Sequence, residues 1–455
     1  MSLFARSFFF FPKGEIMATL NRKEKTPAIH THEGGKAKHV NHEAMLRRSV
    51  MSCLLWENEF YEDGVTIADR IAELIPKIST QKVCDLAIEA RQNMKLRHVP
   101  LWVLRCVGQN SPKVIADVLP KVIQRPDELG EFLALWNKDK RHRIPRSIRR
   151  GLTNALRNFN EYSLAKFDKN SAAWSLRDVL RIIHAMPKNE VESSLWKKIA
   201  KGELATPDTW ETALSAGADK KETFTRLIEE KKLGALALLR NLRNMTEAKV
   251  SDNLIRQALN ECSTDKVLPF RFIAAARYAP RFESELEEAM KRSIIGLPKL
   301  AGSTVVLVDV SGSMDAPLSN RSEMQRIDAA SGLAVLVREL CENVVVYTFS
   351  SNLVEVPTRR GFALVEAIKS SQAHGATELG KAITQLNKKT VDYDRLIVIT
   401  DEQSCQNVSD PVQKLAYGIN VASYRNGVTY GKWTHIDGWS DSVVTYIQNL
   451  EEESS

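Results

Sequence analysis

The chain has 455 residues, of which 43% are hydrophobic and 26% are charged, a balance that excludes a largely disordered protein and predicts two or three globular domains. The first 300 residues contain 51 Lys and Arg against 37 Asp and Glu, whereas residues 301–455 contain 13 against 19. The basic part is expected to attract phosphate groups, although a merely soluble basic surface is the alternative. The six cysteines are scattered singly, which excludes a disulfide framework or a zinc cluster and is typical of reduced thiols in the cytoplasm.

Residues 1–40 are expected to form a flexible N-terminal arm. The apolar run at residues 7–11 is too short for a signal peptide and ends at Pro12. His30 and His32 could begin a metal site, but no convincing third ligand accompanies them, so an arm without a metal is favoured. The sequence contains no stretch of about 20 apolar residues that would span a membrane.

Residues 41–298 predict one helix after another. Apolar residues recur at helical spacing, as Leu46, Val50 and Leu54 do, and Pro, Gly, Asn or Asp separate the segments. Each helix is too short to bury its apolar stripe alone, so the helices must stack on their neighbours. We expect an all-α domain of irregular HEAT-like repeats. Its predicted helices include residues 79–94, 112–124, 127–137, 146–158, 175–186, 220–232, 246–260 and 281–294.

A basic stretch at residues 138–150 is the first candidate for binding RNA. It contains seven Lys and Arg residues and a single acid, Asp139. Pro145 and Ser147 place its second half at the start of a helix, where free backbone N–H groups also attract phosphate. A solvated charged helix face is the alternative. The candidate RNA-binding residues in this stretch are Arg141, Arg143, Arg146, Arg149 and Arg150.

The segment at residues 174–184 is the second candidate. Ser175 and Asp178 predict a capped helix start, and apolar residues then recur along one face. Arg177, Arg181 and His184 follow at helical spacing on another face. Two guanidinium groups and an imidazole can hold phosphates and stack on an unpaired base. Alternatively, His184 and an arginine bond only to a neighbouring helix end.

The pattern changes after Gly302, and residues 299–455 are expected to form an α/β doubly wound domain. Four short runs rich in β-branched residues predict strands that are buried on both faces of a parallel sheet. Amphipathic segments alternate with them. The predicted strands are residues 303–309, 344–350, 396–401 and 419–424, and the predicted helices are residues 324–340, 361–369 and 378–386.

Polar residues at the ends of these strands predict a metal site. Asp309, Ser311 and Ser313 follow the first strand, Asp401 ends a later strand, and Thr377 lies on a turn between them. The carboxyl ends of parallel strands meet at one edge, where open α/β sheets bind ligands. Hard oxygen ligands with few charges favour Mg²⁺, with Mn²⁺ as the second choice. A site of this kind that folds without an ion is the alternative.

Both halves of the chain resemble known families. The five oxygen ligands resemble the metal-ion-dependent adhesion site of von Willebrand factor A domains. Residues 149–152, 164–167 and 174–187 are similar to the TROVE module of Ro proteins. That resemblance implies a closed ring of helical repeats that binds small noncoding Y RNAs on its outer surface and single-stranded ends of misfolded RNAs through its hole. It also implies that Lys166, Arg177, Arg181 and His184 face RNA, and that a 3′ exonuclease is a partner, as in bacterial relatives.

The leading hypothesis is a monomeric, noncatalytic RNA-binding scaffold of RNA quality control or decay. A protein-protein adapter that grips a partner's carboxylate through the metal is the second hypothesis. A third is an RNA-cleaving enzyme that uses Asp309 and Asp401 with Mg²⁺. It is disfavoured because the sequence places no histidine base near Asp309 and no paired aspartates.

Overall fold

The computed structural model describes residues 30, 34–36, 41–51, 64–93, 96–138, 143–168, 174–264, 267, 269–295, 299–318, 324–389, 392–422, 427–437, 443–444, 447–448 and 450–451. These residues form helices as far as Ile294 and a mixed α/β fold from Leu300 onward, which confirms the predicted fold classes. No described helix combines the length and the apolar character that crossing a bilayer requires.

The first helical block consists of α1–α10 and has a hydrophobic core of its own. Fully buried residues such as Leu101, Phe132 and Leu152 belong to this core, which runs from Leu46 to Ile199. Helices that are near one another in the chain stack, with α3 on α4, α5 on α7 and α6 on α9. The helices of this block are α1 (His42–Met51), α2 (Gly64–Leu74), α3 (Thr80–Gln92), α4 (His98–Asn110), α5 (Ile115–Val122), α6 (Asp127–Asn137), α7 (Arg146–Leu156), α8 (Glu161–Phe167), α9 (Leu176–Ile183) and α10 (Glu190–Lys201).

The second helical block consists of α11–α16 and follows a helix-free connector at residues 202–209. The predicted helix at residues 246–260 is wrong, because one helix ends at Glu247 and the next begins at Asp252. Lys249 adopts a left-handed backbone conformation, with φ 57°, and Ser251 precedes the next helix. The helices are α11 (Trp210–Ser215), α12 (Lys220–Glu229), α13 (Ala235–Glu247), α14 (Asp252–Glu261), α15 (Phe270–Tyr278) and α16 (Glu283–Ile294).

The α/β domain is a doubly wound sheet in the order β3-β2-β1-β4-β5-β6, parallel except for the β2–β3 pair. Alternate residues of β1 enter different cores: Val306 and Val308 face the core that contains α17 and α18, whereas Val305 and Leu307 face α19. The elements are β1 (Leu300–Asp309), α17 (Arg326–Leu340), β2 (Cys341–Phe349), β3 (Leu353–Glu355), α18 (Gly361–Lys369), α19 (Leu379–Lys388), β4 (Arg395–Thr400), β5 (Leu415–Asn420) and β6 (Thr434–Asp437).

Strand β5 begins earlier than the predicted strand at residues 419–424. Gly418 lies inside β5 and lowers the β-branched content that marks a strand in the sequence. A glycine is required there because a Cβ atom would collide with the side chain of Thr429. The position of β5 therefore depends on a close contact with a later loop, which strand propensity does not describe.

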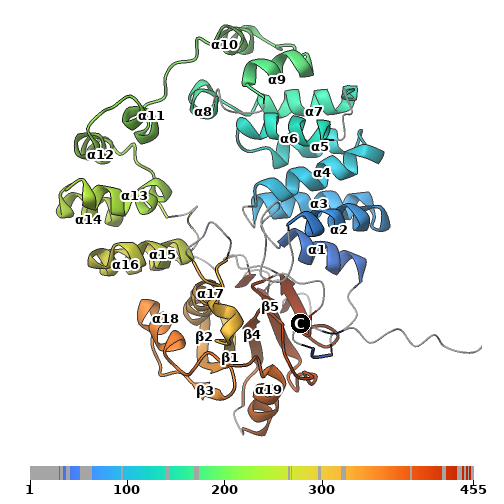
Figure 1. Ribbon diagram of the computed structural model, residues 1–455, viewed down its shortest axis with the longest axis vertical. Coiled ribbons are helices and arrows are strands. Elements are labelled where there is room, and N and C mark those ends of the chain that lie inside the picture. The colour runs from blue at the N-terminus through green and yellow to red at the C-terminus, as the bar shows by residue number, and fades with distance from the viewer. Residues whose placement is uncertain are drawn as a thin grey trace, which may run out of the picture.

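The helices follow an arch, and both of its ends rest on the α/β domain (Figure 1). At one end α1 contacts β6, and at the other end α15 contacts α17 and α16 contacts α18. The core of the second block is continuous with the core on the α17 side of the sheet. The elements therefore form a closed circuit that includes the α/β domain.

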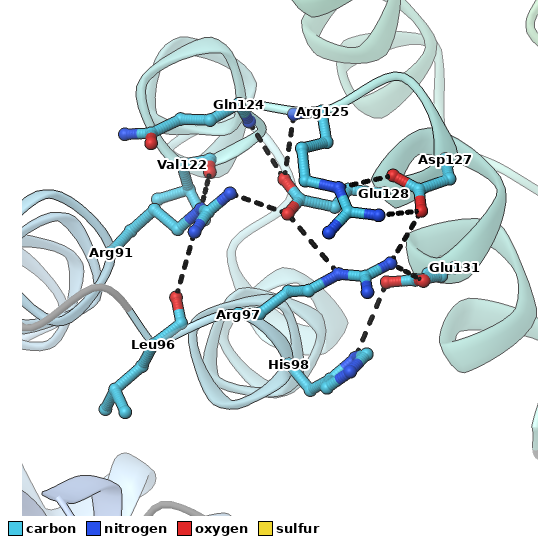
Figure 2. A network of polar contacts seen from close by, with 10 residues as sticks. All are labelled: Arg91, Leu96, Arg97, His98, Val122, Gln124, Arg125, Asp127, Glu128 and Glu131. Atoms are coloured by element: carbon cyan, nitrogen blue, oxygen red, sulfur yellow. Dashed lines mark hydrogen bonds and ion pairs between the residues drawn. The ribbon is translucent and has the colours of Figure 1, made fainter. Parts of the chain in front are cut away.

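A buried carboxylate joins the helices of the first block (Figure 2). Glu128 of α6 is fully buried and accepts a hydrogen bond of 2.6 Å from Arg91 of α3. The backbone N–H groups of Gln124 and Arg125 donate to its other oxygen, at 2.9 and 3.2 Å. Arg97, just before α4, lies between Glu128 and Asp127. Its guanidinium is 2.7 Å from the carboxylate of Asp127 and 3.7 Å from that of Glu128. One network thus fixes α3, α4 and α6 to one another.

Part of the N-terminal arm lies against the α/β domain. His30 and Lys36 form an isolated antiparallel bridge, and Gly35 between them is buried. A Cβ atom on Gly35 would collide with the backbone oxygen of Ser404. This part of the predicted flexible arm is therefore packed, whereas residues 1–29, His32 and His39 lie outside the described residues.

Candidate metal centre and nucleic-acid interface

Two neighbouring strands deliver the two carboxylates of the predicted metal centre to one edge of the sheet. Strand β1 ends at Asp309, and Asp401 directly follows the last residue of β4. The strands are paired in parallel, with Val308 opposite Ile399. Both aspartates are fully buried. The parallel sheet therefore brings together carboxylates that are 92 positions apart in the sequence.

Hydroxyl groups surround the carboxylate of Asp309. The hydroxyl of Thr400 donates to it at 2.6 Å, and the backbone N–H of Ser311 donates at 2.9 Å. The hydroxyl oxygens of Ser311 and Ser313 lie 3.2 Å apart. The first loop thus gathers one carboxylate and two hydroxyls, as its sequence predicts.

The loop that carries Thr377 is hydrogen-bonded to the two loops that carry the aspartates. Its backbone oxygen accepts hydrogen bonds from the N–H of Cys405 at 3.2 Å and from the hydroxyl of Ser404 at 3.3 Å. The N–H of Gly312 donates to the backbone oxygen of Gly375 at 2.9 Å. The three loops that carry the five predicted ligands are therefore bonded to one another.

The electrostatics of this centre fit a cation. Burial, followed by the negative charge of Asp401, raises the pKa of Asp309 to about 7, because two carboxylates share one dry site. Sequence reasoning missed Arg326 at the start of α17, whose guanidinium lies 3.4 Å from a carboxylate oxygen of Asp401. The contact could not be predicted, because an arginine at the start of a helix does not indicate which distant carboxylate it will meet. Arg326 balances part of the negative charge of the two aspartates. The other candidate ligands, Ser311, Ser313 and Thr377, offer hydroxyl oxygens, which Mg²⁺ prefers.

One end of the arch is fixed next to this centre by a second buried carboxylate. Glu402 follows Asp401, has a left-handed backbone with φ 60°, and forms an ion pair with Arg48 of α1. Tyr430 accepts a hydrogen bond of 3.1 Å from the same arginine. Burial raises the pKa of Glu402, but the charges of His435 and Arg48 outweigh it and hold that pKa well below its usual range.

The other end of the arch is fixed in a similar way. Asp328 of α17 is fully buried and accepts a hydrogen bond of 2.5 Å from Arg277 of α15. Lys369 of α18 also pairs with it, and the N–H of Gln325 donates at 2.8 Å. Asp328 lies two residues after Arg326, which contacts the metal centre. Both junctions of the arch thus border the predicted metal centre.

The first basic stretch is divided by its local contacts. Arg143, Arg146 and Arg150 are exposed, whereas Arg149 is half-buried and donates to the backbone oxygen of Ile144 at 3.1 Å. Arg150 also lies 3.5 Å from a carboxylate oxygen of Asp117. Arg141 lies outside the described residues.

The second basic segment forms the expected capped helix. The hydroxyl of Ser175 accepts from the N–H of Asp178, whose side chain accepts in return, and Arg177 and Arg181 lie on α9. Helix α9 ends one residue before His184, which is exposed and has φ 52°. His184 is therefore held at the end of the helix rather than on its face.

The two basic segments belong to neighbouring helices. Helix α7, which begins at Arg146, packs against α9. Lys166 near the end of α8 is exposed, with its ammonium nitrogen 5.8 Å from the centre of the Phe167 ring. Among the described residues, Arg146, Arg177 and Arg181 form no ion pair, although the charge of Asp178 lies near the last two.

The fold and these two sites define a class of protein in which a basic helical module is joined to a von Willebrand A-like domain. Residues 193–326 match the family model of the TROVE domain, and residues 303–426 match that of the Ro60 vWA domain. The chain belongs to the Ro family and is an RNA-binding protein. The matched regions begin after the basic segments of α7 and α9.

A solved structure has the same arrangement. The crystal structure of the Deinococcus radiodurans Ro (RSR) protein covers 90% of this chain and 100% of its own, with a TM-score of 0.61 and 19% sequence identity. At this identity the likeness shows a shared fold, which here extends over the arch and the α/β domain together.

Proposed function

We propose that this protein binds small noncoding Y-like RNA and the single-stranded ends of misfolded RNA, as a noncatalytic, monomeric scaffold of RNA quality control or decay in the cytoplasm. The observation that carries the proposal is the pair of arginines on α9. Arg181 is exposed and Arg177 is half-buried, and neither forms an ion pair with a described residue. Two guanidinium groups one helical turn apart can each hold a phosphate through paired hydrogen bonds.

The surroundings of this pair support a strand of RNA rather than a single anion. Helix α7 packs against α9 and begins with the exposed Arg146. His184 adds an exposed aromatic ring at the end of α9, on which an unpaired base can stack. Several separated positive charges suit a polyanion because each phosphate that is bound releases counterions.

Replacing both Arg177 and Arg181 by Ala should weaken RNA binding about tenfold or more, because each loses hydrogen bonds to a charged group. The slope of log affinity against log salt should also become shallower, by about 0.7 to 0.9 for each phosphate that is no longer neutralised. Fluorescence anisotropy with a labelled stem-loop RNA at several salt concentrations measures both quantities.

The matched control replaces Lys220 and Lys221, two exposed cations at the start of α12, by Ala. This control removes the same formal charge, so its affinity and salt slope should stay close to those of the wild type. If the two double variants lost RNA affinity equally, α9 would not be a specific RNA-binding surface.

For the α/β domain, we propose that Asp309, Ser311, Ser313, Thr377 and Asp401 hold Mg²⁺. A bound divalent ion would offer an open coordination position to an oxygen of a partner protein. The fully buried pair of aspartates supports this role, because buried like charges are stabilised by a cation. The 3′ exonuclease that the family resemblance implies is one candidate for this partner.

Mg²⁺ should raise the melting temperature of the wild-type protein, because an ion that binds only the folded state stabilises it. Asp309→Asn should abolish this rise. Differential scanning calorimetry with and without Mg²⁺ measures it, with Asp315→Asn, an exchange outside the five ligands, as the control. An unchanged Mg²⁺ response in Asp309→Asn would exclude this centre as the binding site.

A further inference from the structure

A pocket of about 330 Å³ lies between α13 and α15 of the second helical block, which carries none of the predicted RNA-contact residues. Residues on one face of each helix line it from both sides: Leu236, Arg240 and Arg243 from α13, and Arg271 and Tyr278, two turns apart, from α15. The two helices pack against each other, so the pocket lies over their seam. Its volume is within the range of pockets that hold small ligands.

Positive charge is concentrated in this pocket. Among the described residues that line it, three are arginines and none is acidic. Arg243 donates to Glu247 at 2.9 Å, outside the lining, whereas Arg240 forms no ion pair with a described residue. Packing around Arg271, followed by the positive charge of Arg240, lowers the pKa of Arg271. The two guanidinium groups are thus close enough to act on each other, so an anion bound by Arg240 would also lie near Arg271.

The same pocket has an aromatic and apolar part. Tyr278 is 45% exposed and Leu236 is 44% exposed, which leaves a ring and an aliphatic side chain open to solvent. An exposed tyrosine ring is a platform on which a nucleic-acid base can stack, whichever base it is. Inorganic phosphate or an acidic side chain would use the arginines but leave this part empty.

We propose that the pocket holds one nucleotide of a single-stranded RNA, with its phosphate on Arg240 and Arg271 and its base on Tyr278. This inference rests on the proposed RNA-binding function. It adds a second contact site, separate from α9, that accepts single-stranded RNA without reading its sequence. Sequence reasoning missed it because the arginines of α13 and α15 are 31 positions apart and neither helix is strongly basic alone.

The test measures binding of a labelled eight-nucleotide oligoadenylate to the full-length protein by fluorescence anisotropy at several salt concentrations. Arg240→Ala and Arg271→Ala should each weaken binding about tenfold and make the salt slope shallower, by at most about 0.7 because the two arginines share one phosphate. Tyr278→Ala should weaken binding about tenfold without changing the slope, and Tyr278→Phe, which keeps the ring, should bind like the wild type. Arg359→Ala, which removes an exposed arginine of the α/β domain, is the charge-matched control.

The outcomes separate this inference from the proposed function. Normal oligoadenylate binding by the pocket variants, together with a loss in the variant lacking Arg177 and Arg181, would overturn the pocket and leave the function standing. A loss in the arginine variants but not in Tyr278→Ala would overturn the nucleotide assignment, because only phosphate would be bound. Displacement of the oligonucleotide by an equal concentration of adenosine monophosphate would overturn the assignment to an RNA strand. A wild-type protein that binds no RNA would refute both proposals.

Discussion

Glu128 shows how a single buried charge can hold several helices in place. Its carboxylate is surrounded by Arg91, Arg97 and two backbone N–H groups, so nearly all of its hydrogen-bonding capacity is used (Figure 2). Burial, only partly offset by these arginines, raises the pKa of Glu128. The network therefore fixes the geometry of α3, α4 and α6 more than it adds net stability, because desolvating the charges costs most of what their attraction supplies.

Replacing Glu128 by Ala should lower the free energy of unfolding by about 3–5 kcal/mol, since Arg91 would remain buried without its carboxylate partner. Urea unfolding followed by circular dichroism measures this change. Glu43→Ala is the control, because Glu43 is exposed and pairs with Lys82 at the surface, where such a pair contributes at most about 1 kcal/mol. Similar losses in the two variants would contradict the special role of Glu128.

At the level of single residues, the positions of the candidate ligands could be predicted from the sequence better than their surroundings. Asp309 and Asp401 could be predicted because each directly follows a strand, and parallel strands end at a common edge. Arg326 and Arg48 could not, because each reaches its carboxylate from a distant segment; Arg48 and Glu402 are separated by 354 positions. Periodicity describes the neighbours of a residue along the chain, and these contacts depend on tertiary packing.

Among the elements, the connector at residues 202–209 joins two helical blocks without a helix of its own. Asp208 lies next to α11 and accepts hydrogen bonds from Arg226 of α12 at 2.8 Å and from Lys232 at 2.8 Å. These bonds hold the pKa of Asp208 well below its usual range. The carboxylate thus ties the end of the connector to the second block.

The contribution of Asp208 to stability should depend on pH. Because its folded-state pKa is depressed, the contribution is present above the unfolded-state pKa of about 3.9 and is lost as the pH falls toward the folded-state value. The melting temperature of Asp208→Asn should therefore lie below that of the wild type at pH 6, and the gap should narrow below pH 4. Scanning calorimetry across this range measures it.

Asp69→Asn is the control for this prediction. Asp69 lies exposed on α2 and forms no ion pair with a described residue. The melting temperature of Asp69→Asn should differ little from that of the wild type at every pH. A constant gap for Asp208→Asn across the range would show that its ion pairs do not stabilise the folded state.

The order and type of the elements could be predicted from the sequence, but some boundaries could not. Residues 246–260 look like one amphipathic helix, yet the chain turns at Lys249, which is neither glycine nor proline. Packing of α13 against α14 and α15 compensates the cost of that left-handed residue. The pattern of a single sequence predicts such a turn only where a glycine or proline is present.

For the whole molecule, closure of the arch depends on two contacts between an arginine and a buried carboxylate. Arg48 and Glu402 fix the first block, and Arg277 and Asp328 fix the second. Both carboxylates are fully buried. Since Glu402 directly follows Asp401, the predicted metal centre and the first junction share one loop.

Arg48→Ala should destabilise the junction between α1 and the α/β domain by about 3–5 kcal/mol, because Glu402 would remain buried with less compensation. The arch should then open at this end. Small-angle scattering should report a larger radius of gyration, and unfolding should separate into two transitions. Arg360→Ala, which removes an exposed ion pair with Glu339, should change neither. An unaltered radius in Arg48→Ala would show that other contacts keep the arch closed.

The separate core of the first helical block has a consequence for how the chain folds. A nascent chain could complete that block as soon as α10 is made, whereas α11–α16 must wait for the sheet before their apolar surface is covered. The cooperative folding units would then divide at residues 202–209 and not where helices give way to strands. A cut at the latter position would expose the apolar face of α15 and α17 to aggregation, even though the fold changes character there.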